Sequence, residues 1–140
     1  MPVAKEFTVF LEDRAGTLGK LCQSLADCGV NILALHSFPF GGKSITRFIV
    51  DNPGAAKTAL EGKRLTLTLT EVLLLKVANR PGEIARIAAR LGEANININY
   101  AYCGLEAGTN TPLVFFGVSE SEVGRAAQIL EQAAAASAKS

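Results

Sequence analysis

Tryptophan is absent from the sequence, and aromatic residues of all kinds make up only 6% of the 140 positions. An excess of one charge sign is also lacking, because 14 lysines and arginines balance 13 aspartates and glutamates and leave a net charge of +1. Nucleic-acid binding depends on a basic surface, and single strands also need aromatic side chains on which bases stack. The composition therefore argues against nucleic acid as a partner.

Long hydrophobic runs are missing as well. No apolar segment is long enough to span a membrane, and the first seven residues enter a strand pattern directly, without the layout of a signal peptide. Hydrophobic residues make up 49% of the chain, which is typical of a globular protein with a core. We therefore expect a cytoplasmic protein with no membrane partner.

Metal-binding and catalytic patterns are scarce. The one histidine, His36, has no cysteine or carboxylate at ligand spacing. The three cysteines lack C-x-x-C spacing and are most simply small buried hydrophobic residues. GxSxG, P-loop and HExxH motifs are absent, and adjacent strand residues such as His36 and Ser37 point to opposite faces. We expect no metal, no cofactor and no enzymatic activity.

The sequence instead contains one pattern twice, 66 positions apart. Asp13-Arg14-Ala15-Gly16-Thr17-Leu18 aligns with Asn79-Arg80-Pro81-Gly82-Glu83-Ile84, and Gly29-Val30-Asn31-Ile32 aligns with Asn95-Ile96-Asn97-Ile98. Between these segments, apolar positions coincide with apolar positions and charges with like charges. A repeat of this length contains several secondary-structure elements. It predicts two small domains of one fold.

The first copy has the order β-α-β-β-α-β. Alternating and β-prone residues predict four strands, at residues 7–11, 30–38, 44–50 and 65–70. Apolar residues three and four apart predict a helix from Thr17 to about Cys28, which Gly29 ends. A second helix begins at Asp51-Asn52-Pro53 and ends near Gly62.

The second copy follows without a linker, because residues 70–72 contain no turn-forming residue and the strand before them continues to residue 77. A helix over residues 84–91 and strands at 96–102 and 113–118 come next, and a Ser119–Glu122 capping box begins the last helix. No strand follows this helix. An open sheet edge is usually covered by another chain or by a loop, and on this ground we expect a homodimer.

The fold class is therefore α+β, with two ferredoxin-like βαββαβ domains at residues 1–70 and 71–140. Each domain has an antiparallel sheet with its helices on one face, and the second copy lacks its last strand. Its alanine-rich end, from about residue 133, is expected to be a frayed tail or a continuation of the helix. This fold hosts many activities, so the function depends on the site.

Two pairs of repeated residues are candidates for a site. Gly16 and Gly82 precede helices, where free backbone N–H groups attract carboxylates. The neighbouring side chains of the loop either cap the helix or hold an amino-acid ligand. Asn31 and Asn97 occupy strands, which asparagine disfavours. Their amides either satisfy a nearby helix start or are presented to a small polar ligand.

These segments resemble the signature of the ACT-domain family, the small amino-acid-sensing modules of metabolic enzymes. The family pattern is similar to D/N-R-P-G-x-L, an amphipathic helix, and then G-x-N-I, and it occurs here twice in register. The resemblance covers about residues 5–132, and it implies a stand-alone tandem ACT protein. In that family the domains pair side by side, with the ligand between the first loop of one domain and the second strand of its partner.

The resemblance implies seven ligand-binding positions in each copy. Asp13 and Asn79 would hold polar groups of the ligand, the backbone after them would donate N–H groups to its carboxylate, and the strand asparagines would add further bonds. In the first copy the positions are Asp13, Ala15, Gly16, Thr17, Leu18, Asn31 and Ile32. In the second copy they are Asn79, Pro81, Gly82, Glu83, Ile84, Asn97 and Ile98.

Two departures from the family pattern distinguish the copies. Ala15 replaces the motif proline in the first copy, and Asn95 replaces the glycine in the second, so the copies differ in affinity or one is silent. The implied function is a non-catalytic regulatory protein in which a bound amino acid shifts the arrangement of paired domains. One alternative is a regulatory subunit that acts only through contact with an amino-acid metabolic enzyme. A weaker alternative is a small enzyme on a ferredoxin-like scaffold.

Overall fold

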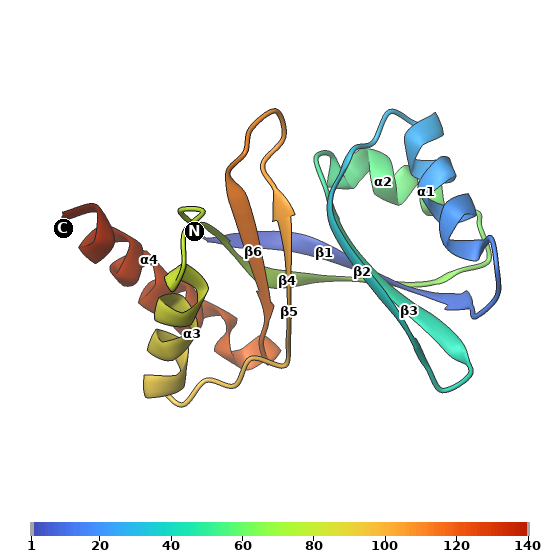
Figure 1. The fold of residues 1–140 in the computed structure, drawn as a ribbon. Helices are drawn as coiled ribbons and strands as arrows, with labels where there is room; N and C mark the ends of the chain where they lie inside the picture. The colour runs from blue at the N-terminus through green and yellow to red at the C-terminus, as the bar shows by residue number, and fades with distance from the viewer. Residues whose placement is uncertain (1, 140) are drawn as a thin grey trace. The chain divides into compact units, whose positions relative to one another are not determined.

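A computed structural model describes residues 2–139, with the side chains of residues 2–134. The described chain divides into two compact units, one of residues 5–70 and one in which residues 2–4 join residues 71–139. Both units contain the order strand, helix, strand, strand, helix, and among the described residues a further strand follows only in the first unit (Figure 1). None of the described helices combines the length and the apolar character that crossing a membrane requires.

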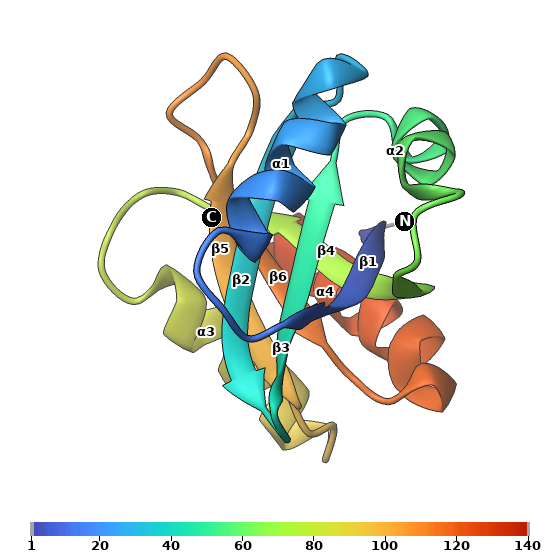
Figure 2. The same ribbon diagram turned by 90° about the vertical axis from the view of Figure 1, so that its right-hand side faces the viewer.

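The first unit is an antiparallel sheet with two helices that contact each other (Figure 2). Its strand order is β2-β3-β1-β4, which is the ferredoxin-like order, and in the register of β1 and β3 Phe7 pairs with Phe48. The elements are β1 (Val3–Glu12), α1 (Thr17–Asp27), β2 (Ile32–Phe40), β3 (Lys43–Val50), α2 (Pro53–Leu60) and β4 (Thr66–Lys76).

The core of the first unit joins one face of the sheet to the inner faces of both helices. Alternate residues of β1, Phe7, Val9 and Leu11, point into it, as the period of two in a strand requires. Leu21 and Leu25 of α1 enter from the helical layer. The rings of Phe7 and Phe48 stack at 5.2 Å between centroids, so the paired strands also meet through their side chains.

The second unit repeats this plan from the continuous strand β4 onward. The uninterrupted β4 confirms the prediction that the first copy runs into the second without a linker. The further elements are α3 (Glu83–Glu93), β5 (Tyr100–Leu105), β6 (Pro112–Gly117), the short 3-10 helix η1 (Glu120–Glu122) and α4 (Val123–Lys139). Both α3 and α4 contribute to one core with β4 and β6, centred on Leu73, Leu91, Phe116 and Leu130.

The start of the chain fills the place of the missing strand in the second unit. The Leu74 N–H on β4 donates to the Pro2 carbonyl (2.9 Å), and Val3 packs against the core of this unit. The strand order of the unit is thus β5-β6-β4 followed by the first residues of β1. The sequence pattern predicted an open edge covered by a second chain or a loop, and here the first residues of the same chain supply the partner of Leu74. A terminus distant in sequence from β4 gives no local signal of this pairing.

Three local predictions differ from the structure. β5 begins at Tyr100 instead of residue 96, after a turn at Asn95, which has a left-handed φ of 59°. Ser119 makes no side-chain cap; its carbonyl accepts from the Glu122 N–H (2.8 Å) instead. Where a frayed tail was one expectation from about residue 133, α4 is helical to Lys139, as suits an alanine-rich segment.

Removing residues 1–4 should loosen the second unit more than the first. The deletion leaves the Leu74 N–H without its acceptor and removes the packing of Val3. We expect hydrogen exchange at Leu74 to accelerate by about fivefold or more, since one hydrogen bond contributes about 1 kcal/mol net. Mass spectrometry of exchanged peptides measures this. Pro2→Ala keeps the carbonyl and is the matched control; equal protection of Leu74 in the deletion and in this control would refute the pairing.

Candidate functional site

The loop before the first helix of each copy turns through a left-handed glycine. Gly16, at the N-terminus of α1, has φ 92°, and Gly82, at the N-terminus of α3, has φ 88°. A Cβ atom built at either position would meet nothing within 4 Å. The backbone conformation, and not a lack of space, therefore requires glycine here. The space in front of each helix start is open.

Neither helix start is capped by the polar side chain that the motif offers. Among the described residues, Asp13 and Asn79 make no side-chain hydrogen bond, and both are exposed. Capping, which the sequence left open for them, is thus not their role in this structure. The unpaired N–H groups of a first helical turn carry partial positive charge, so each loop presents a favourable place for a carboxylate.

The first loop is closed by Thr17 and by an ion pair. The Thr17 hydroxyl donates to the Glu12 carbonyl (2.9 Å) and lies 3.1 Å from the carbonyl of Arg14. The Arg14 guanidinium donates to the carboxylate of Glu12, and this hydrogen bond with the arginine charge lowers the pKa of Glu12. Both ends of the loop are therefore held before the helix begins.

The second loop has a glutamate where the first has Thr17. Glu83 accepts hydrogen bonds from Arg80 Nε (2.8 Å) and Arg86 Nη2 (3.2 Å), and only 8% of the residue is exposed. The hydrogen bonds from Arg80 and then Arg86 hold the pKa of Glu83 below its ordinary value. The carboxylate of Glu83 is thus ionised and neutralised by one arginine of the loop and one of α3.

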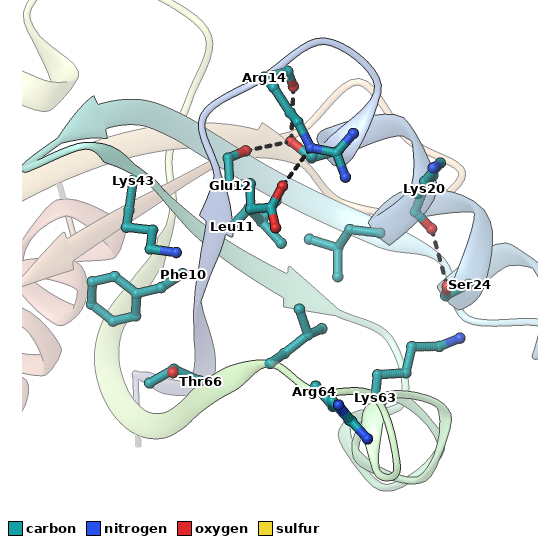
Figure 3. Close-up of a pocket in the computed structure, with 13 residues that line it drawn as sticks. Phe10, Leu11, Glu12, Arg14, Lys20, Ser24, Lys43, Lys63, Arg64 and Thr66 are labelled. Carbon is teal, nitrogen blue, oxygen red and sulfur yellow. Dashed lines mark hydrogen bonds and ion pairs between the residues drawn. The ribbon is translucent and has the colours of Figure 1, made fainter.

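A cavity of about 450 Å³ lies beside the loop of the first copy (Figure 3). Leu11, Leu21 and Leu65 give it an apolar lining, and hydroxyl groups come from Thr17, Ser24 and Thr66. Its charged residues are one acid, Glu12, and five bases: Arg14, Lys20, Lys43, Lys63 and Arg64. Figure 3 shows them arriving from different segments, with Arg14 and Lys20 on the α1 side and Lys63 and Arg64 across from them.

A cavity of about 240 Å³ lies beside the corresponding loop of the second copy. Seven residues of the first cavity align with seven of the second at the repeat distance of 66 positions. The first set is Phe10, Leu11, Glu12, Arg14, Thr17, Lys20 and Leu21, and the second set is Lys76, Val77, Ala78, Arg80, Glu83, Arg86 and Ile87. The sequence repeat is therefore also a repeat of cavities.

The candidate asparagines lie at the other end of the helices. The Asn31 N–H donates to Asp51 Oδ1 (2.9 Å), and the Asn97 side chain donates to Asn99 Oδ1 (2.9 Å). The helix start that Asn31 might have satisfied is instead capped by Asn52, which accepts from the Ala55 N–H. Since α1 has 11 residues and rises 1.5 Å per residue, about 16 Å separates the loop from Asn31. One copy alone does not bring the two groups of candidates together.

Sequence reasoning missed most of the residues that line the first cavity. Lys43, Lys63 and Arg64 carried no motif in the sequence. These residues come from the start of β3 and from the segment before β4, so only the fold places them together. One signal was present: Lys20 aligns with Arg86, a repeated positive charge one turn into the helix.

The cysteines and His36 lie outside the cavities. Cys28 and Cys103 are exposed and Cys22 is half-buried, so the expectation that all three are buried hydrophobic residues is wrong for two of them. Burial raises the pKa of the Cys22 thiol and, together with Arg47, lowers the pKa of His36. Within residues 2–139, no group of three histidine, cysteine or acidic side chains could hold a metal ion.

The sequence as a whole matches a known family. Residues 1–138 fit the model of an ACT domain pair. This chain belongs to the ACT domain pair family. The match confirms the resemblance seen in the repeated motif and the fold class of two ferredoxin-like ACT domains. No curated protein matches the sequence.

Several solved structures are similar to this chain. A protein from Bacteroides thetaiotaomicron is 27% identical and has a TM-score of 0.80; the match covers 94% of this chain and 88% of that one. The regulatory subunit of aspartate kinase from Thermus flavus is 18% identical, with a TM-score of 0.57 and coverage of 95% of this chain and 97% of that one. The ligand-free subunit from Thermus thermophilus is 19% identical, with a TM-score of 0.57 and coverage of 94% and 91%. These two subunits share the fold.

Gly16→Ala should destabilise the first unit by about 1 kcal/mol or more, because a side chain strains the left-handed conformation. Gly19→Ala, inside α1 and with open space around its Cβ position, should instead stabilise by about 0.5–1 kcal/mol. Urea unfolding of both variants measures the difference. If the two substitutions shifted the midpoint in the same direction, the left-handed turn would not be the reason for glycine at position 16.

The Glu83 ion pairs should make stability depend on pH. Because the folded-state pKa is lowered, ionised Glu83 stabilises the fold above about pH 4.3, the ordinary glutamate pKa, and this contribution is lost as the pH falls through the folded value. Glu83→Gln should therefore lower the urea midpoint at pH 7, and this deficit should be smaller near pH 3. Glu93→Gln, an exposed position on α3, is the control. A Glu83→Gln deficit that is equal at both pH values would contradict the ion-pair explanation.

Proposed function

We propose that this ACT domain pair is a non-catalytic regulatory protein that binds an amino acid at its repeated loops. The observation that supports this most directly is the loop itself. In each copy a left-handed glycine and an uncapped helix start lie next to a cavity. Such a site can bind the carboxylate of a small molecule, and the described residues around it offer no arrangement of nucleophile and base.

The ligand chemistry follows from the groups around the loop. The backbone N–H groups after Gly16 would bind the carboxylate, and the free side chain of Asp13 would bind the ammonium group. The exposed side chain of Leu18 and the half-buried Ile32 offer apolar contacts for the rest of the ligand. In the second copy the same positions are Asn79, Gly82, Ile84 and Ile98.

The regulatory step would be a change in how ACT domains pair. Asn31 lies about 16 Å from the loop of its own domain along α1. An amino acid that touches both would therefore bridge two domains, as the family resemblance implies. β2, which contains Ile32, is the outer strand of the first unit, so its edge is available to pair with a second copy in a homodimer. The output would pass to an amino-acid metabolic enzyme.

A thermal-shift screen against the twenty amino acids tests this function. Binding to the folded state stabilises by about 2.7 kcal/mol at a hundredfold excess over Kd, so one amino acid should raise the Tm by several degrees. Asn31→Ala or Asn97→Ala should remove most of the shift. Asn110→Ala, in the exposed loop before β6, should keep it. If no amino acid raises the Tm, the site is not an amino-acid sensor, and regulation by protein contact alone becomes the better account.

A further inference from the structure

The two repeat-related cavities differ in how their charges are balanced. In the first cavity, Arg14 is paired with Glu12. Within the described residues, the other four bases, Lys20, Lys43, Lys63 and Arg64, form no ion pair within 4 Å. Like charges around a shared cavity repel, and a cleft lined by one sign of charge concentrates ions of the other sign. The first cavity is therefore complementary to an anion.

The second cavity is balanced by its own side chains. Glu83 binds Arg80 and Arg86, and Lys76 pairs with Glu106 at 2.6 Å. Every basic residue that lines this cavity thus has an acidic partner within the same unit. The cavity is also smaller, about 240 Å³ against about 450 Å³. The second cavity therefore offers an anion no unpaired basic side chain and a smaller volume than the first cavity.

One position accounts for much of this difference. Thr17 is the first residue of α1, and Glu83 is the first residue of α3. Each has an arginine three positions before it, Arg14 or Arg80, and a base three positions after it, Lys20 or Arg86. In the second copy the carboxylate of Glu83 fills the space between those two bases. In the first copy Thr17 provides only a hydroxyl, which is directed to the carbonyls of its own loop.

We propose that the cavity of the first copy binds a small organic anion, and that Glu83 supplies the equivalent carboxylate from within the second copy and closes it to such a ligand. This inference rests on the proposed function, which supplies the premise that a ligand binds. It adds that the ligand is an anion and that the first copy binds it. The apolar lining of Leu11, Leu21 and Leu65 favours an organic body over a bare inorganic ion. A dicarboxylate, including an acidic amino acid, and a phosphate ester share the required chemistry.

Isothermal titration of the full chain at low salt tests the proposal. The first probes are L-glutamate and L-aspartate, together with glutarate and succinate, which are their analogues without the amino group. The others are glycerol 3-phosphate, inorganic phosphate and the neutral L-leucine. We expect one site per chain for an organic anion, with affinity that falls as salt is added. Comparison of glutarate with glycerol 3-phosphate distinguishes a carboxylate from a phosphate ligand. Binding of inorganic phosphate as tight as that of every organic anion would overturn the assignment to an organic ligand.

Reciprocal variants test the role of the exchanged position. Thr17→Glu should weaken anion binding by about tenfold or more, because it places a carboxylate between Arg14 and Lys20. The loop accepts glutamate at this position, as Glu83 shows in the other copy. Thr17→Gln removes the same hydroxyl without adding charge and is the matched control. Glu83→Thr should free Arg80 and Arg86 and raise the stoichiometry toward two.

The outcomes separate this proposal from the proposed function. Equal losses in Thr17→Glu and Thr17→Gln, with folding verified by circular dichroism, would overturn the charge argument. Binding of L-leucine that Thr17→Glu leaves unchanged would support an amino-acid sensor and refute the anion site. Glutarate binding as tightly as L-glutamate would support the anion site and refute recognition of an amino acid. Absence of binding by every probe and all twenty amino acids would refute both.

Discussion

The left-handed turn at Gly16 and Gly82 is the constraint on which the candidate site depends. At each position φ is close to 90°, which a side chain disfavours, and the chain passes directly from the end of a strand into a helix. This reversal brings the first helical turn next to the strand end, and the cavity lies between them. It also leaves both helix starts without a capping side chain, and the Thr17 N–H of the first copy is bonded to the Arg14 carbonyl (3.4 Å).

Much of the fold could be predicted from the sequence, because its signals are local. The period of two in residues 65–70, the helical spacing after Thr17 and the lack of turn residues at 70–72 each correspond to an element found in the structure. The covering of β4 by Pro2 could not be predicted, since it joins segments about seventy positions apart without a shared motif. For the same reason the candidate glycines were recognisable, whereas the bases around the cavity became visible only when β3 and β4 were in place.

The two copies show how a repeat can keep its backbone and change its chemistry. The positive-φ glycine, the helix start and seven cavity positions are retained, so the fold imposes the same geometry twice. The charges are free to differ, because most of them belong to exposed side chains that the core does not fix. Exchange of threonine for glutamate at the first helical residue, which is half-buried as Thr17 and buried as Glu83, replaces a site for an external anion with an internal ion pair. The electrostatics of each copy thus depend on a few residues that contribute little to the core.

The separation of the loop from the strand asparagine limits how any ligand could act. A ligand that touches only the loop and its cavity is held by one domain, and it can then shift domain pairing only through charge or through the loop itself. A ligand that also reaches an asparagine in the position of Asn31 must bridge two domains, because about 16 Å of helix separates the two groups within one copy. In the second case binding and pairing are linked, and each strengthens the other by the same free energy. Affinity for the bridging ligand would then rise with protein concentration if the second domain belonged to another chain, whereas affinity for a ligand confined to the first cavity would not.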